Sequence, residues 1–233
     1  MKLTVVYDNN AERGLKSGWG FSCLIENKKN ILFDTGDNGK KLVYNLKKLN
    51  KNIEDIDFIV LSHEHWDHID GLDEILNLNK NLTVIVPESF SEKFKNKIKE
   101  KAKLKEIKDE EKIVNDIYTT GELNSSIGLK EQSLVIKTKK GNILITGCAH
   151  PGIVNVVRKA RELSDKNIYL VLGGFHLSGI SDSELNSIIK DFKELGVHKV
   201  APCHCSGERC QELFKREYKH NFIEDGAGGV IRI

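Results

Sequence analysis

Residues 63–68, His-Glu-His-Trp-Asp-His, decide the fold, and they come just after an apolar run at residues 58–61, Phe-Ile-Val-Leu. An uninterrupted apolar run this short predicts a strand that is buried on both faces. In extended or turn geometry, His63 and His65 project the same way, so their two imidazoles can hold one cation. The sequence therefore predicts a metal site at the end of a buried strand.

A second cation is predicted beside the first. Asp67 and His68 fall on a tight turn, and their carboxylate and imidazole are both common metal ligands. The competing interpretation is a helical zinc motif, His-Glu-x-x-His, which needs a histidine four residues after His63. Asp67 stands at that position and the segment starts from a strand, so the spacing excludes this motif.

Other apolar runs also end close to a histidine. Ligand sites in layered α/β folds gather beyond the carboxyl ends of strands, so we expect these histidines to converge with residues 63–68 on one pair of cations. They are His150 after Ile143–Thr146, His176 after Ile168–Leu172, and His204 after Val200–Ala201. The two remaining histidines after residue 190, His198 and His220, are interpreted as surface residues.

The two halves of the chain follow one scheme. A hairpin is predicted from Gly18–Ile25 to Asn30–Phe33, and another from Ser133–Lys137 to Asn142–Thr146. In each half, short apolar strands alternating with amphipathic helices follow the hairpin. This order predicts an α/β protein with two sheets packed face to face and helices outside them.

Local signals set the remaining expectations. Ser181 and Glu184 form a capping box that predicts the start of a helix. Two short final strands are expected within residues 222–233. The polar stretch Lys99–Glu111 is interpreted as a connector between the halves, so a single domain spanning 1–233 is predicted.

Composition narrows the function classes. The formal charge of +2 over 233 residues and the interspersed lysines argue against nucleic acid as a partner. No apolar stretch approaches the ~18 residues needed to span a bilayer, and the N-terminal apolar run is too short for a signal peptide. The five cysteines are an odd number without disulfide-like spacing. We therefore expect a cytoplasmic protein with reduced thiols and no membrane partner; the oligomeric state is left open.

The motif His-x-His-x-Asp-His, preceded by Phe33-Asp34-Thr35-Gly36, resembles the signature of the metallo-β-lactamase superfamily. The resemblance implies a four-layer αββα sandwich of the metallo-β-lactamase type with two divalent metal ions. Zinc is the first expectation for both ions, with manganese, iron or magnesium as alternatives. It also implies that Asp34 orients a ligand histidine. The implied ligands of the first metal are His63 and His65, and those of the second are Asp67, His68 and His204.

The chain departs from the common pattern of that superfamily in two places. The usual Gly-His ligand is missing from residues 126–133, and the usual bridging aspartate is replaced by Cys148. His150 is expected to supply the missing ligand of the first metal. Cys148 is interpreted as a small buried residue in preference to a thiolate ligand.

Three further stretches, 146–152, 173–177 and 201–207, resemble one branch of the superfamily. That branch is related to the archaeal 7,8-dihydropterin-6-methyl-4-(β-D-ribofuranosyl)aminobenzene 5′-phosphate synthase of methanopterin biosynthesis. The resemblance implies an enzyme, first a hydrolase that attacks an ester or phosphoester with a metal-bound hydroxide. The alternatives are a pterin transferase that releases pyrophosphate and a non-catalytic metal-binding module.

The expected catalytic residues are Asp67 and His176. His176 has no counterpart among the usual ligands, and we expect it to bind a substrate phosphate or to donate a proton. The substrate is expected to be a small molecule, either phosphorylated or pterin-like. The triplet Cys203-His204-Cys205 looks like a zinc knuckle, but strand alternation would place both cysteines opposite His204, which excludes that interpretation.

Overall fold

The computed structural model describes residues 1–164 and 166–233. The chain forms two compact units, one made of residues 1–108 and 226–233 and the other of residues 109–225. Every helix in the described ranges is too short or too polar to cross a lipid bilayer.

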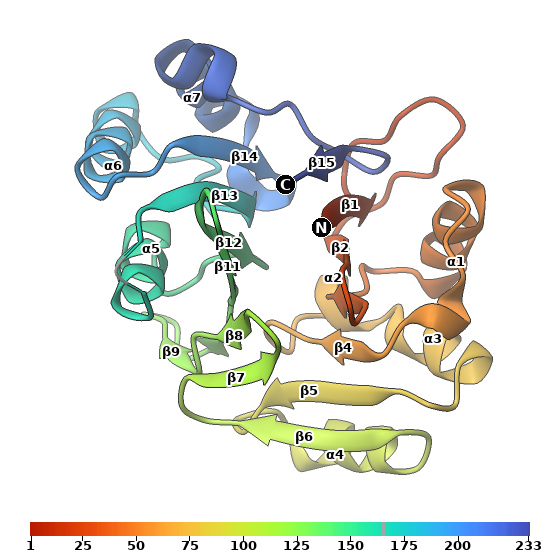
Figure 1. The fold of residues 1–233 in the computed structure, drawn as a ribbon. Helices are drawn as coiled ribbons and strands as arrows, with labels where there is room; N and C mark the ends of the chain where they lie inside the picture. Colours follow the sequence, from red (N-terminus) through yellow and green to blue (C-terminus); the bar gives the residue numbers. More distant parts are fainter. Residues whose placement is uncertain (165) are drawn as a thin grey trace. The chain divides into compact units, whose positions relative to one another are not determined.

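The first unit is built on a mixed sheet (Figure 1). Its strands are β1 Lys2–Tyr7, β2 Ser22–Glu26, β3 Ile31–Phe33, β4 Phe58–Val60, β5 Thr83–Pro87, β6 Lys103–Ile107 and β15 Val230–Arg232. They lie in the order β15-β1-β2-β3-β4-β5-β6, with antiparallel pairing from β15 to β3 and parallel pairing from β3 to β6. The predicted hairpin of β2 and β3 is confirmed, and β4 ends directly before residues 63–68.

Helices of the first unit cover the sheet with apolar side chains. They are α1 Gly39–Lys48, α2 Trp66–Ile69, α3 Leu72–Leu78 and α4 Glu92–Lys99, with a 3₁₀ turn at Ile53–Asp55. The side chain of Asn38 caps α1 by accepting a hydrogen bond from the amide of Lys41, 3.1 Å away. Leu42 and Leu46 of α1 pack with Ile75 of α3 in one buried cluster beneath the helices.

The interpretation of residues 99–111 as a mere connector was wrong, because part of the stretch forms β6. Its lysine and glutamate side chains sit on the edge strand of the sheet, paired in parallel with β5 alone. Charged side chains on an edge strand discourage pairing with another chain, and they hide the apolar alternation by which strands are recognised. The expectation of two strands in residues 222–233 was also wrong, since only β15 forms there in the described chain.

The second unit has its own mixed sheet. Its strands are β7 Glu111–Val114, β8 Ile117–Thr119, β11 Leu134–Thr138, β12 Gly141–Thr146, β13 Ile168–Gly174 and β14 Lys199–Cys203, with a small separate pair, β9 Leu123–Asn124 and β10 Lys130–Glu131. The sheet order is β14-β13-β12-β11-β8-β7. The predicted hairpin of β11 and β12 is confirmed, and β12, β13 and β14 run parallel, so their carboxyl ends lie at one edge.

Helices pack against this second sheet (Figure 1). They are α5 Ile153–Glu162, α6 Asp182–Glu194 and α7 Glu208–Tyr218, with 3₁₀ turns at His204–Ser206 and Lys219–Asn221. The capping box of Ser181 and Glu184 is present at the start of α6, as predicted. Phe175, Phe192 and Phe214 pack edge to face or tilted, with ring centroids 5.4–5.7 Å apart, and anchor the core behind the strand ends.

Candidate metal centre

The first unit gathers His63, His65, Asp67 and His68 beyond the end of β4. The chain leaves the strand at Val60 and enters α2 at Trp66, so the cluster spans an extended segment and the first turn of a short helix. The ring centroid of His63 lies 4.7 Å from that of His65 and 4.2 Å from that of His68. The ligand atoms of His63 and His65 lie within 4.8 Å of each other, and so do those of Asp67 and His68.

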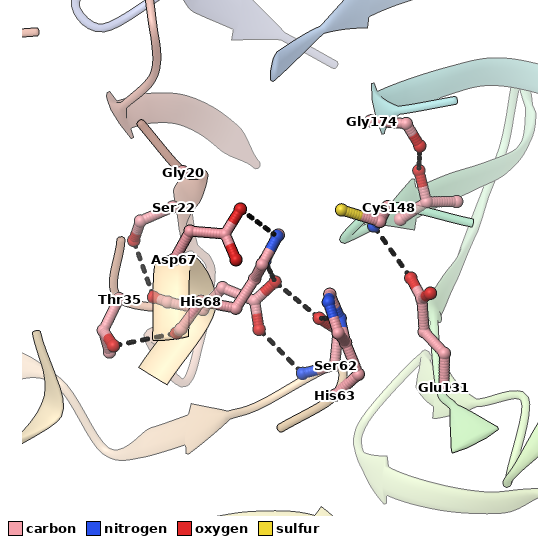
Figure 2. Close-up of polar contacts among 12 residues, drawn as sticks. Gly20, Ser22, Thr35, Ser62, His63, Asp67, His68, Glu131, Cys148 and Gly174 are labelled. Carbon is pink, nitrogen blue, oxygen red and sulfur yellow. Dashed lines mark hydrogen bonds and ion pairs between the residues drawn. The ribbon is translucent and has the colours of Figure 1, made fainter. Parts of the chain in front are cut away.

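A hydrogen-bonded relay orients two of these imidazoles (Figure 2). His68 Nδ1 lies 2.7 Å from Asp34 Oδ2, and Ser62 Oγ donates to the same oxygen over 2.7 Å. A carboxylate only accepts hydrogen bonds, so His68 must carry its proton on Nδ1. Ser62 has one hydroxyl proton and gives it to Asp34, so at 2.9 Å it must accept from Nδ1 of His63. Both rings therefore present Nε2 as the ligand atom.

Asp34 is fully buried. It lies in the loop after β3, the strand that pairs in parallel with β4. Burial raises the pKa of its carboxyl above the ordinary value, while His68 and Ser62 oppose that shift. Its backbone is in the left-handed region at φ 56°, a conformation that residues other than glycine seldom adopt. Strained residues of this kind cluster at functional sites, where surrounding contacts hold them.

The turn after Asp34 also holds the backbone of the histidine motif. The amide and the hydroxyl of Thr35 both donate to the carbonyl of His68, over 2.8 and 2.9 Å. Gly20, two residues before β2, approaches so closely that a Cβ there would lie 2.1 Å from the carbonyl oxygen of Asp67. Gly20 also has φ 134°, so only glycine fits this position, and the motif is fixed from two sides.

In the second unit, His150 is oriented by a buried glutamate. Glu131 Oε2 lies 2.8 Å from His150 Nδ1 and accepts the amide of His150 over 2.9 Å. Its other oxygen, Oε1, accepts the amides of Cys148 and Ala149, each over 2.8 Å (Figure 2 shows Glu131 beneath Cys148). The glutamate accepts a hydrogen bond from Nδ1, so the ring proton of His150 stays on Nδ1. Nε2 is then the ligand atom, which is the state of a metal-ligating imidazole.

His176 and two cysteines form another cluster in the second unit. The ligand atoms of Cys148, His176 and Cys205 all lie within 4.8 Å of one another, and the rings of His150 and His176 are 4.5 Å apart. A hydrogen bond with Cys148 and another with His176 lower the pKa of Cys205 well below its ordinary value, although burial opposes this. The hydrogen bond with Cys205 raises the pKa of His176.

The expectation that strand alternation separates His204 from its neighbouring cysteines was wrong. β14 ends at Cys203, and His204–Ser206 is a 3₁₀ turn, so the period-two rule does not apply there. His204 is buried with φ 51°. The surface positions predicted for His198 and His220 are confirmed, since both are exposed.

The donor set of each unit fits a divalent transition metal. Imidazole and carboxylate suit zinc, iron and manganese, and zinc also takes thiolate. In the first unit, the rings of His63 and His68 are already held in the tautomer that ligation requires. Glu64, the base in the excluded helical zinc motif, is instead engaged by the amide and hydroxyl of Ser91, each 2.5 Å away.

Apart from Asp34, sequence reasoning missed the residues that hold the candidate ligands. Ser62 carried a weak signal, because it is a lone small polar residue between an apolar run and a histidine. Glu131 carried none, since it lies in the stretch where a ligand was expected and not found. Cys205 was set aside with the zinc-knuckle interpretation, although it joins Cys148 and His176.

Comparison with known proteins gives matches over most of the chain. The model of the metallo-beta-lactamase superfamily matches residues 20–204. The 7,8-dihydropterin-6-methyl-4-(beta-D-ribofuranosyl)-aminobenzene-5′-phosphate synthase of Methanocaldococcus jannaschii is 33% identical, and the match covers 91% of this chain and 89% of that protein. A second M. jannaschii protein, which is uncharacterized, is 35% identical over 99% of this chain and its own full length.

One solved structure is similar along the full chain. Tm1679, described as a metal-dependent hydrolase of the beta-lactamase superfamily, superimposes with a TM-score of 0.87 at 30% identity. The match covers 100% of this chain and 99% of Tm1679. The predicted fold class, α/β with two sheets flanked by helices, is therefore confirmed.

Proposed function

Because the chain belongs to the metallo-β-lactamase superfamily, we propose that it is a metal-dependent hydrolase that cleaves an ester or phosphoester of a small molecule. One observation carries this proposal. Asp34 holds His68 directly, and His63 through Ser62, with both imidazoles presenting Nε2. A carboxylate that fixes the tautomer of a histidine is the usual support of a metal ligand. The similarity to Tm1679, described as a hydrolase, supports the same reaction class.

The proposed ligands are five histidines and one aspartate. Two divalent ions are proposed, zinc first, with manganese, iron or magnesium as alternatives, since nitrogen and oxygen donors accept several metals. The orientation of His150 by Glu131 supports its place in the set. The first ion is assigned to His63, His65 and His150, and the second to Asp67, His68 and His204.

The chain's own residues have distinct roles in the proposed hydrolysis. When bound, the ions would supply Lewis acidity and lower the pKa of water toward neutrality. Asp67 lies 6% exposed with Oδ2 3.7 Å from His68 Nε2, and its carboxylate is proposed to take the proton of the attacking water. His176, which is exposed beyond β13, is proposed to bind a substrate phosphate or to protonate the leaving group.

A pterin transferase is the second candidate, favoured by the relative that is 33% identical over 91% of this chain. In that reaction, a carbon of the aminobenzene partner would be the nucleophile, and pyrophosphate would leave from the pterin substrate. The proposed ligands are the same in both reactions, so the substrate decides between them.

Turnover assays separate the candidates. The metal-loaded protein is incubated with the pterin diphosphate and the aminobenzene ribotide, and separately with a chromogenic phosphodiester and a chromogenic ester. Cleavage of the chromogenic substrates, without pyrophosphate release from the pair, supports the hydrolase. Pyrophosphate release that requires both partners supports the transferase instead. A protein that binds metal and turns over neither set is a binding module.

The ligand assignment is tested with one histidine from the cluster and one from the surface. We predict that His65→Ala loses one metal equivalent together with activity, because alanine has no atom that can bind a metal ion. His198→Ala is the matched control, since His198 is exposed and stacks on Tyr169 with ring centroids 5.8 Å apart. Unchanged metal content in His65→Ala, measured by elemental analysis, refutes the assignment.

A further inference from the structure

Cys148, His176 and Cys205 come from the ends of three adjacent parallel strands, although they are far apart in the chain. Cys148 follows β12, His176 follows β13, and Cys205 follows β14. Their ligand atoms lie within 4.8 Å of one another, and the three residues belong to the second unit. The proposed hydrolysis gives the two sulfur atoms no role.

Hydrogen bonds fix these three strand ends against one another. Thr146 Oγ1 donates to the carbonyl of Gly174 over 2.8 Å, which ties the end of β12 to that of β13 (Figure 2). The amide of Phe175 donates to Ser206 Oγ over 3.1 Å, and that hydroxyl donates to the carbonyl of Cys203 over 2.7 Å. The 3₁₀ turn that carries Cys205 is therefore anchored to β13, and the cluster is preorganised.

Gly174 has no side chain, which leaves space for Cys205 Sγ beside the backbone of Cys148. A Cβ on Gly174 would lie 2.7 Å from Cys205 Sγ and 3.2 Å from the Cα of Cys148. Cys205 Sγ also lies 3.8 Å from the carbonyl oxygen of Cys148. Any larger residue at position 174 would displace the thiol, so the backbone leaves room for the two cysteines to approach each other.

His176 closes the cluster from the solvent side. Cys148 is 3% exposed and Cys205 is 9% exposed, whereas His176 is exposed. The backbone of His176 has φ 53°, a strained conformation that residues other than glycine seldom adopt. The next residue, Leu177, is buried in the core, which helps to hold this conformation. The residue with this strained backbone carries the imidazole ring that lies beside the two sulfur atoms.

Two thiolates and one imidazole are a donor set with clear metal preference. Zinc binds sulfur at ~2.3 Å and imidazole nitrogen at ~2.0 Å in tetrahedral geometry, and sites with three protein ligands keep a fourth position open. Magnesium and calcium prefer oxygen donors and would not select such a set. The side open to solvent at His176 is where a fourth ligand can enter.

We propose that Cys148, Cys205 and His176 form a binding site for one thiophilic divalent cation, zinc in first place, with a coordination position open to solvent. All three residues belong to the second unit, and His176 is here a metal ligand in place of the phosphate-binding or proton-donating role proposed for it above. Cys148 is buried, as the sequence predicts, and the proposal adds a ligand role for its thiolate.

Cobalt is the probe for sulfur ligation. Metal-free protein is titrated with Co²⁺ alone, and the near-ultraviolet absorption that arises from sulfur-to-cobalt charge transfer is recorded. We expect a band in the wild type that falls about twofold in Cys148→Ser and in Cys205→Ser and disappears in the double variant. Cys210→Ser is the matched control, because Cys210 is fully buried in α7 and burial raises the pKa of its thiol to about 12.

A second measurement requires no substitution. X-ray absorption at the zinc edge of wild-type protein loaded with Zn²⁺ alone is expected to contain sulfur neighbours at ~2.3 Å. Absence of sulfur neighbours, or absence of the cobalt band in the wild type, overturns the proposal. A band of undiminished intensity in folded Cys205→Ser also overturns it, because Cys148 alone would then be the ligand. A band that persists in His65→Ala shows that the sulfur site stands even if the hydrolase assignment fails.

Discussion

Asp34→Asn is the substitution that tests how the candidate ligands are oriented. In the wild type, Asp34 Oδ1 accepts the amide of Ser62, and Oδ2 accepts from Ser62 Oγ and His68 Nδ1, all at 2.7 Å. Asparagine keeps one oxygen, which the amide of Ser62 still needs, and places an NH₂ group where Oδ2 was. Two donors then face Ser62 Oγ and His68 Nδ1. His68 must move its proton to Nε2, which removes its ligand atom.

The same change reaches His63 through Ser62. Once Ser62 Oγ accepts from the new amide, its own proton points toward Nδ1 of His63, and that ring must also carry its proton on Nε2. One buried substitution therefore switches two imidazoles. Supporting residues of metal ligands typically contribute 10–100-fold in affinity, which corresponds to about 1.4–2.7 kcal/mol.

The loss of folding stability is measured separately from the loss of metal affinity. Bonds to a charged group stabilise by about 1.5–3 kcal/mol and neutral ones by about 0.5–1.5, so exchanging two of them lowers the free energy of unfolding by about 2 kcal/mol. Urea denaturation of metal-free protein measures this change. Competition with a chromophoric chelator measures the affinity for each of the two proposed ions.

The matched control is Asp182→Asn on the surface. Asp182 pairs with Arg209 outside any candidate site, and surface substitutions change the free energy of unfolding by about 0.5 kcal/mol or less. Metal affinity in Asp182→Asn is expected to equal that of the wild type. If Asp34→Asn folds and binds both metal equivalents with wild-type affinity, the tautomer relay does not control ligation and the reasoning fails.

Three further substitutions test other parts of the structure. Glu131→Gln places an amide against two donors of His150, so metal affinity at that histidine is expected to fall 10–100-fold in chelator competition; an unchanged dissociation constant would contradict the role of Glu131. Gly20→Ala drives a methyl group into the carbonyl of Asp67 at φ 134° and should lower the free energy of unfolding by about 1–3 kcal/mol, visible as a lower Tm. Glu26 is partly buried, which raises its pKa, but hydrogen bonds from two lysines outweigh this and leave the pKa below 4.5. The stabilisation that the ionised Glu26 gives the folded protein is therefore complete above pH 4.5, and it is lost as the pH falls through the lowered pKa of the folded state. Glu26→Gln should be about 0.5–1 kcal/mol less stable than the wild type at neutral pH and equally stable in strong acid.

The strands and helices with apolar periodicity could be predicted from the sequence. The strand before residues 63–68 was found from its uninterrupted apolar run, the helix after Ser181 from its capping box, and both hairpins from paired apolar segments joined by a polar turn. Strand β6 was missed for the opposite reason. Its lysines and glutamate at the sheet edge carry the signature of a polar connector, and only pairing with β5 makes them a strand.

The candidate ligands could be predicted where they are consecutive, and their supporting residues could not. His63 to His68 stand together in the chain, so spacing alone reveals the cluster. Asp34 was expected from the family motif, and its contact with His68 is confirmed. Glu131 comes close to His150 because the hairpin of β11 and β12 brings the segment before β11 back beside the segment after β12. Cys205 comes close to its partners because β12, β13 and β14, which are far apart in the sequence, pair in one sheet. Local patterns in the sequence do not carry this information.

The two units reach the same electrostatic arrangement from different sequences. In the first unit, Asp34 in the loop after β3 accepts a hydrogen bond from Nδ1 of His68. In the second unit, Glu131 of β10 accepts one from Nδ1 of His150. Each carboxylate also accepts backbone amides of the segment that carries its histidine, so loop position and ring tautomer are set by one buried group. Loss of either carboxylate should therefore disturb loop geometry and metal affinity together. A surface histidine such as His198 has no such coupling, and its removal should change neither.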